Sequence, residues 1–292
     1  MASTPQPIST VAVLGTGILG TPIAINLAKA GFSVGAWNRT YAKAEPLSDH
    51  GITVEKAAKD AVRGADAILT ILTHAEAVTE TMKAAAPGLS PGAVWLQVST
   101  VGIDASEGFD DFAKEHDLVW FDAPVLGTKE PAEQAKLVHI PAGPLEHRER
   151  IQPVLDAYGH KTVWLGADPA SGEGSKLKMA LNLFVLELNH AVAESFSLAQ
   201  GLGLDPQLIL DVLTGGAVDS GYLQVKGKKI LSKEMAPSVT AANAHKDATL
   251  IAAAGRSAGL TLELAEASAA RFARTVKSGH GELDMIASFL AD

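Results

Sequence analysis

Short runs of aliphatic residues alternate with amphipathic stretches along residues 11–165. Apolar runs of four to eight residues are typical of buried strands in a parallel sheet, and the amphipathic stretches between them are typical of crossover helices. We predict a helix at residues 18–30, between the first two strands. The first half is therefore predicted to be an α/β domain with a mainly parallel sheet. The predicted strands are residues 11–14, 33–37, 67–72, 94–98, 118–121, 137–142 and 162–165.

The pattern changes after Gly166, where residues 166–174 are rich in Gly, Ser, Asp and Pro and predict a loop that ends in a helix start. An uninterrupted helical pattern then covers residues 175–200, and no further strand is predicted. We expect a disordered lead at residues 1–10, the α/β domain at residues 11–166 and an all-helical domain at residues 167–292. The later predicted helices are residues 206–213, 223–231, 241–258 and 262–278.

A glycine-rich turn follows the first predicted strand directly. Its sequence is Gly15-Thr16-Gly17-Ile18-Leu19-Gly20, which places a G-x-G-x-x-G pattern at the mouth of a helix. The first glycine permits the tight turn, the second lets the backbone approach a pyrophosphate, and the third lets helix and strand pack closely. Unpaired N–H groups at the helix start then bind the anion. This context predicts a Rossmann-type dinucleotide site that includes Thr16, Ile18 and Leu19.

The end of the second predicted strand indicates which nucleotide binds. A carboxylate is expected about 20 residues after the turn in an NAD site, whereas this chain has Asn38-Arg39-Thr40 there. An amide, a guanidinium and a hydroxyl can all contact a 2′-phosphate without repulsion. The triplet therefore favours NADP(H). Alternatively, it caps a helix that begins near Ala42, because Asn and Thr are good N-caps.

A nicotinamide cofactor carries a hydride, so the protein must supply a proton donor. Lys178 and Asn182 lie four residues apart on one face of the long predicted helix, while Lys176 points elsewhere. Burial and the positive end of the helix dipole would both lower the pKa of Lys178, so that it could protonate a developing alkoxide. The alternative is a solvated lysine on an amphipathic helix.

Two further segments are candidates for the site. The stretch Asp122-Ala123-Pro124-Val125-Leu126-Gly127-Thr128 follows a predicted strand and reads as a loop at the carboxyl end of the sheet, where ligands bind in open α/β folds. N–H groups around Gly127 and Thr128 could hold a substrate oxygen, although such turns are often purely structural. Lys246 and Asp247 form either an ion pair at the same site or one more surface pair.

Charge and composition exclude several functions. The 24 basic and 33 acidic residues give a net charge of −9, which has the wrong sign for wrapping nucleic acid. The chain has 0 cysteines, so thiolate metal sites and Cys nucleophiles are excluded, and the nine histidines show no metal-binding spacing. We found no run of about 18 apolar residues and no leader sequence. We therefore expect a cytoplasmic protein with no metal, no membrane partner and no nucleic-acid partner.

Together these residues resemble the β-hydroxyacid dehydrogenase family, in particular its glyoxylate and succinic semialdehyde reductase branch. The resemblance covers nearly the whole chain. It implies a Rossmann domain joined by a long helix to a helical domain that makes the dimer contact, with an active site in the interdomain cleft. The motifs that carry it are residues 15–20, 38–40, Ser99-Thr100, residues 122–125 and 129–133, residues 174–182 and Lys246-Asp247.

The resemblance also implies roles for single residues. Lys178 would be the general acid/base, Asn182 would orient the substrate, Lys246 and Asp247 would lie near cofactor and substrate, and Thr100 would lie beside the nicotinamide ribose. Leu72 and Thr73 complete the candidate cofactor residues, and Leu126, Gly127, Thr128 and Val239 the candidate substrate residues.

Two positions depart from the family pattern. Leu126 replaces a serine after Ala-Pro-Val, and Val239 replaces an aromatic residue eight positions before Asp247. Loss of the serine hydroxyl weakens the case for a small acid substrate and favours a less polar one. Three hypotheses follow: an NADPH-dependent carbonyl reductase, an imine reductase similar to a related family with the same Asn-Arg-Thr signature, and a non-catalytic NADPH-binding module. The expected assembly is a homodimer or homotetramer.

Overall fold

The computed structural model describes residues 7–291, which divide into two compact units, residues 7–178 and residues 179–291. Most of the expected disordered lead, residues 1–6, lies outside the described residues. Ser9 and Thr10 donate their backbone N–H groups to Asp66 Oδ2 at 2.8 and 2.9 Å, and the first strand begins at Thr10. We refer to the two parts as unit 1 and unit 2 and describe each by itself.

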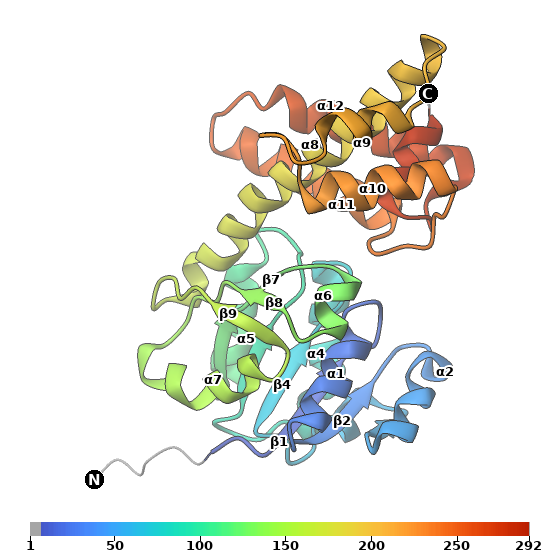
Figure 1. Cartoon of the computed structure of the whole chain (residues 1–292). Coiled ribbons are helices and arrows are strands. Elements are labelled where there is room, and N and C mark those ends of the chain that lie inside the picture. Colours follow the sequence, from blue (N-terminus) through green and yellow to red (C-terminus); the bar gives the residue numbers. More distant parts are fainter. Residues whose placement is uncertain (1–6, 292) are drawn as a thin grey trace. The chain divides into compact units, whose positions relative to one another are not determined.

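Unit 1 contains a six-stranded parallel sheet of order β3-β2-β1-β4-β5-β6 (Figure 1). The order reverses between β1 and β4, where Val11 pairs with Ala67 and Leu14 with Thr70. The carboxyl ends of strands at such a switch point are where ligands bind in open α/β folds. The strands are β1 (Thr10–Leu14), β2 (Ser33–Trp37), β3 (Thr53–Glu55), β4 (Ala67–Thr70), β5 (Val94–Gln97) and β6 (Val119–Asp122).

Both faces of this sheet are covered, because successive strand residues point to opposite sides. On one face Val11, Val13 and Leu69 pack with α1 (Gly20–Lys29) and α7 (Arg148–Asp156). On the other, Ala12, Leu14 and Ile68 pack with three helices. The expected α/β domain with a mainly parallel sheet is confirmed. The second group of helices is α3 (Ala58–Ala61), α4 (Ala75–Ala85) and α5 (Ser106–Glu115).

A second, three-stranded sheet in unit 1 differs from the sequence prediction. It has the order β7-β8-β9, with β7 (Val125–Leu126) antiparallel to β8 (Leu137–His139) and β8 parallel to β9 (Gly159–Thr162). The segment expected as one loop at residues 122–128 therefore contains a strand. The strand expected at 162–165 lies instead at Gly159–Thr162. The hydrophobic pattern missed it because its residues are mostly polar and half of them are exposed. The short helices α2 (Tyr41–Ala44) and α6 (Lys129–Glu133) complete the named helices of the unit.

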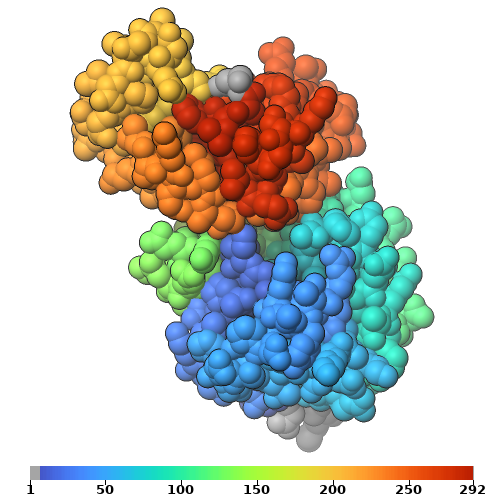
Figure 2. Space-filling view, turned by 90° about the vertical axis from the view of Figure 1, so that its right-hand side faces the viewer, coloured from blue at the N-terminus to red at the C-terminus, as the bar shows by residue number. Residues whose placement is uncertain are grey.

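Unit 2 is helical, as predicted; all nine strands of the described residues lie before residue 163. Its core gathers around α8 (Glu173–Gly201), whose Val192, Ala193 and Phe196 pack with Leu210, Leu223, Ile230 and Ile286. Figure 2 shows the orange and red segments of this unit packed against one another. The other elements are α9 (Gln207–Leu213), α10 (Gly221–Ser232), α11 (Ala241–Ser257), α12 (Glu263–Thr275), a π-helical turn (Val276–His280) and a 3-10 segment (Met285–Ala291).

A buried ion pair fixes the C-terminal segment to unit 2. Lys226 Nζ of α10 lies 2.5 Å from Asp284 Oδ1, and the two side chains are 3% and 0% exposed. Asp284 also accepts hydrogen bonds from the Ser238 backbone N–H and hydroxyl, at 2.9 and 2.8 Å.

Among residues 7–291, no helix combines the length and the apolar character that crossing a bilayer requires.

Candidate functional site

The glycine-rich turn links β1 to α1 and leaves room for a ligand at one glycine. Gly15 has a φ of +107°, and a Cβ on it would lie 2.2 Å from the Ile71 carbonyl oxygen. A Cβ on Gly20 would lie 1.8 Å from the Gly15 carbonyl oxygen. Gly17, in contrast, would meet no described atom within 4 Å. Packing therefore requires the outer glycines, whereas the space beside Gly17 is available to a ligand that approaches the backbone.

The glycine-rich turn is hydrogen-bonded to the residues that follow β2. The Thr16 backbone N–H donates to Asn38 Oδ1 at 3.3 Å, and Asn38 Nδ2 donates to the Thr40 carbonyl at 3.0 Å. Thr16 is 3% exposed, and its hydroxyl has no hydrogen-bond partner among the described residues. Buried polar atoms are rarely left unpaired, so this hydroxyl fits a site that a nucleotide completes.

Arg39 follows Asn38 and is exposed. It makes no ion pair or hydrogen bond with another of residues 7–291. The triplet of residues 38–40 holds an amide, a guanidinium and a hydroxyl and no carboxylate, so its polar groups could bind the ribose end of a dinucleotide. Thr40 precedes α2, but its side chain does not cap that helix.

The ends of β4 and β5 carry the next candidates. Ser99 is buried; its hydroxyl donates to the Thr70 carbonyl at 3.0 Å and accepts from the Leu72 N–H at 2.8 Å. The bond from Leu72 holds the backbone at that residue, and the carbonyl of the preceding Ile71 lies beside Gly15 of the glycine-rich turn. Thr73 is exposed and Thr100 half-buried, both just beyond strand ends. The sequence interpretation quoted Ser99 as part of a motif and missed its structural role.

Lys178 lies in the second turn of α8 and is only 7% exposed, whereas Lys176 is exposed. The predicted difference between these two lysines is confirmed. Asn182, one turn later, is 8% exposed and donates from Nδ2 to Asp247 Oδ2 of α11 at 3.0 Å. Asp247 Oδ1 lies 2.9 Å from Lys246 Nζ, and the two side chains are 14% and 27% exposed. Lys246 and Asp247 are therefore not a solvated surface pair.

The candidate substrate residues lie in two places. Leu126 and Gly127 are half-buried at the end of β7, where Gly127 has a φ of +137° and a Cβ would lie 2.5 Å from Leu137 Cδ2. Thr128 precedes α6 without capping it through its side chain. Val239 is half-buried just before α11, and its carbonyl accepts from the Met285 N–H at 2.9 Å.

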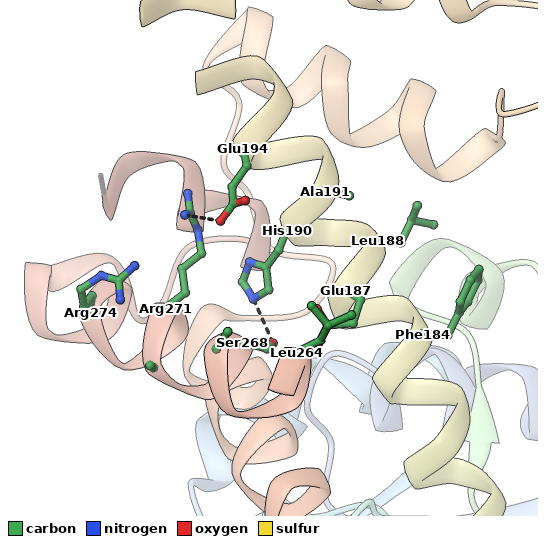
Figure 3. Close-up of a pocket in the computed structure, with 12 residues that line it drawn as sticks. Phe184, Glu187, Leu188, His190, Ala191, Glu194, Leu264, Ser268, Arg271 and Arg274 are labelled. Atoms are coloured by element: carbon green, nitrogen blue, oxygen red, sulfur yellow. Dashed lines mark hydrogen bonds and ion pairs between the residues drawn. The ribbon is translucent and has the colours of Figure 1, made fainter. Parts of the chain in front are cut away.

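A separate groove of about 600 Å³ opens in unit 2 between α8 and α12 (Figure 3). Phe184 at its edge is 70% exposed, and Leu264 is 65% exposed. Burial raises the pKa of Glu187 to about 7, and one of its carboxylate oxygens is buried with no hydrogen-bond partner among the described residues. His190 Nε2 lies within hydrogen-bond distance of the Ser268 hydroxyl, at 2.9 Å. Arg271 Nη1 forms an ion pair with Glu194 Oε1 at 3.0 Å.

Two family descriptions match the chain. Residues 10–166 match the NAD binding domain of 6-phosphogluconate dehydrogenase, and residues 172–289 match the NAD-binding domain of NADP-dependent 3-hydroxyisobutyrate dehydrogenase. Over 253 residues the chain is 30% identical to the chloroplastic glyoxylate/succinic semialdehyde reductase 2 of Arabidopsis thaliana, covering 85% of this chain and 70% of that protein.

Solved structures have the same fold. The 3-hydroxyisobutyrate dehydrogenase of Salmonella typhimurium superposes with a TM-score of 0.88 at 23% identity, covering 97% of this chain and 99% of that chain. The Mycobacterium tuberculosis 3-hydroxyisobutyrate dehydrogenase solved with L-serine gives 0.83 at 27% identity, covering 97% and 98%. An Aspergillus terreus reductive aminase solved with NADPH shares the fold, with a TM-score of 0.65 at 22% identity, covering 97% and 98%.

The fold and the nucleotide site define an NAD(P)-binding oxidoreductase. Within this class the chain belongs to the β-hydroxyacid dehydrogenase family, which confirms the resemblance noted from the sequence.

Proposed function

We propose that this chain is an NADP(H)-dependent reductase of small aldehydes or ketones, which in reverse oxidises the corresponding β-hydroxy acids. The observation that carries the proposal is the burial of Lys178 one turn before Asn182, which itself holds Asp247 at 3.0 Å. Removing an ammonium from water is costly, so a buried lysine beside a polar network favours a chemical role over a solvated one.

The cofactor assignment is supported by the turn and by the end of β2. The turn of residues 15–20 would hold the pyrophosphate, and Asn38, Arg39 and Thr40 would hold the 2′-phosphate. Leu72, Thr73, Thr100 and Lys246 would contact the rest of the cofactor. When bound, its nicotinamide would supply the hydride.

The chain's own residues would manage the proton and the substrate. Lys178 donates a proton to the carbonyl oxygen as negative charge develops there. Asn182 orients the substrate, and its side chain is kept in one orientation by the bond to Asp247. The residues that would contact the substrate are Leu126, Gly127, Thr128 and Val239.

One observation favours a second candidate reaction, the reduction of an imine. Leu126 presents an aliphatic side chain, half-buried, where a serine hydroxyl would otherwise hold a substrate carboxylate. An apolar wall of this kind favours a substrate without that carboxylate. The third hypothesis, an NADPH-binding module without turnover, is disfavoured by family membership and by the buried Lys178 and Asn182.

We also propose that the protein is a homodimer or homotetramer built through the groove of unit 2. The groove has carboxylates of Glu187 and Glu194 on α8 and guanidinium groups of Arg271 and Arg274 on α12. Arg274 is exposed and makes no ion pair with another described residue. A two-fold related copy would bring an arginine to Glu187 and a carboxylate to Arg274, while covering Phe184.

The function is tested by following NADPH absorbance with glyoxylate, succinic semialdehyde and a cyclic imine. We expect turnover of at least one aldehyde, and Lys178→Ala should lower kcat by about 10² or more with little change in NADPH affinity. Lys176→Ala is the matched control and should behave like the unmodified protein at about pH 8, well above the pKa of about 6 of the Asp122 carboxyl that the Lys176 charge influences. Full activity of the Lys178 variant would remove Lys178 from the mechanism. Turnover of the imine alone would favour the second reaction, and NADPH binding without any turnover would favour the binding module.

A further inference from the structure

Asp122, the last residue of β6, joins the sheet of unit 1 to the start of α8. Its Oδ2 accepts from the Ser175 backbone N–H at 2.7 Å, and its Oδ1 accepts from the Ser175 hydroxyl at 2.8 Å. The Gly174 N–H also contributes a hydrogen bond to this carboxylate. The first N–H groups of a helix have no partner within the helix. Asp122 therefore caps α8 from 53 residues earlier in the chain.

The contact is tight and closed to solvent. Asp122 is 1% exposed and Ser175 is 5% exposed. A Cβ on Gly174 would lie 2.6 Å from the Asp122 carbonyl oxygen and 2.8 Å from the Ile140 carbonyl oxygen. The backbone of Asp122 is held in turn, because its N–H and carbonyl both bond to Ala142, at 3.1 and 2.9 Å. The first turn of α8 therefore packs closely on the backbone of Asp122 and Ile140, and hydrogen bonds to Ala142 hold the Asp122 backbone in place.

Lys178 follows Ser175 by three residues on this helix, so the two side chains lie on the same side of it. Both are buried. Any rotation of the first turn about the helix axis would displace the ammonium, which stands at the end of four methylene groups. A misplacement of about 1 Å at a reacting group can cost about 10²-fold in rate.

We propose that Asp122 is a positioning residue for the reaction, because its carboxylate fixes the first turn of α8 and thereby the direction in which Lys178 extends. The inference rests on the proposed function of Lys178. It assigns to the Asp122–Ser175 contact a part in turnover beyond that of a helix cap.

The ionisation of Asp122 separates a positioning role from a merely structural one. Burial raises the pKa of Asp122 to about 6, against hydrogen bonds from Ser175 and Gly174 and the charge of Lys176, which lower it. Lys176 is the charged side chain that acts on this carboxyl among the described residues; its other neighbours are backbone groups and the Ser175 hydroxyl. A protonated carboxyl accepts hydrogen bonds less well, so kcat should fall as the pH drops below about 6.

The test compares Asp122→Asn, Ser175→Ala and the control Ser171→Ala. The Ser171 hydroxyl donates to the nearby Asp168 carbonyl at 2.7 Å and, among residues 7–291, to no distant segment. We expect Asp122→Asn to lower kcat by about 10- to 100-fold and to abolish the fall of kcat near pH 6. NADPH affinity should stay unchanged, and hydrogen exchange should become faster in the peptide that covers the start of α8. Ser175→Ala should shift the fall to higher pH, because it removes a hydrogen bond that favours the charged carboxylate.

Two outcomes separate this inference from the function on which it rests. Unchanged kcat and pH profile in the Asp122 variant, combined with a large loss in Lys178→Ala, would overturn the positioning role alone. Full activity of Lys178→Ala would overturn the proposed function instead. If Asp122→Asn does not fold, Ser175→Ala decides, and a pH profile identical to that of Ser171→Ala overturns the inference.

Discussion

Two glycines of the same turn should respond to alanine in opposite ways. A Cβ on Gly20 would lie 1.8 Å from the Gly15 carbonyl oxygen. Gly15 follows β1 and Gly20 begins α1, so neither backbone can move without shifting one of these elements. Relief requires the helix start to shift by about 1 Å or more, which we expect to cost about 1–3 kcal/mol of the free energy of unfolding. Gly17 meets no described atom within 4 Å and does not have a positive φ. Gly17→Ala should therefore leave stability unchanged or raise it by about 0.4–1 kcal/mol.

Although Gly17→Ala should not lower stability, it should weaken the binding of NADPH. If the space beside it holds the pyrophosphate, a methyl group there keeps the nucleotide from the backbone N–H groups. We expect the Kd for NADPH to rise about tenfold or more, equivalent to about 1.4 kcal/mol. Calorimetric titration gives the Kd, and chemical denaturation of the same samples gives the stability. Unchanged NADPH affinity in a folded Gly17→Ala protein would refute the assignment of this turn to the cofactor.

Three further predictions follow from other parts of the structure. Arg39→Ala should weaken NADPH by about tenfold or more and leave NADH nearly unaffected; equal losses for both nucleotides would contradict the 2′-phosphate assignment. Phe184→Asp should dissociate the oligomer in sedimentation velocity, whereas Leu145→Asp, at an equally apolar position of unit 1 that is 60% exposed, should not; equal behaviour would argue against the groove as the interface. Lys226→Ala should lose about 3–5 kcal/mol in urea denaturation, because it leaves Asp284 buried without its cation; a loss below about 1 kcal/mol would contradict this reasoning.

The fold could be predicted where the hydrophobic pattern was strong. Strands buried on both faces, such as β1 and β4, and long helices such as α8 and α11 follow from aliphatic runs and from periodicity. In the small sheet, β8 lies within the predicted strand at residues 137–142. The other two strands could not be predicted this way, because β7 has two residues and β9 includes exposed His160 and Lys161. Short or polar strands depend on pairing with distant segments, which local sequence does not encode.

The candidate site shows the same limit. The burial of Lys178 was predictable from its apolar neighbours. In contrast, the partner of Asn182 lies 65 residues away, and that of Ser175 lies 53 residues away. The strand-end position of Asp122 and the serine in the first turn of α8 were the available signals. These signals indicate that the end of β6 and the start of α8 each need a hydrogen-bond partner. Only the fold shows that Asp122 and Ser175 are partners of each other.

A structure with bound NADP⁺ and a carbonyl substrate analogue would show whether Lys178 delivers the proton. We expect Lys178 Nζ to lie about 2.6–3.2 Å from the analogue's oxygen, or to reach it through one water. An ammonium that points into bulk solvent, with the analogue's oxygen held by other groups, would contradict it.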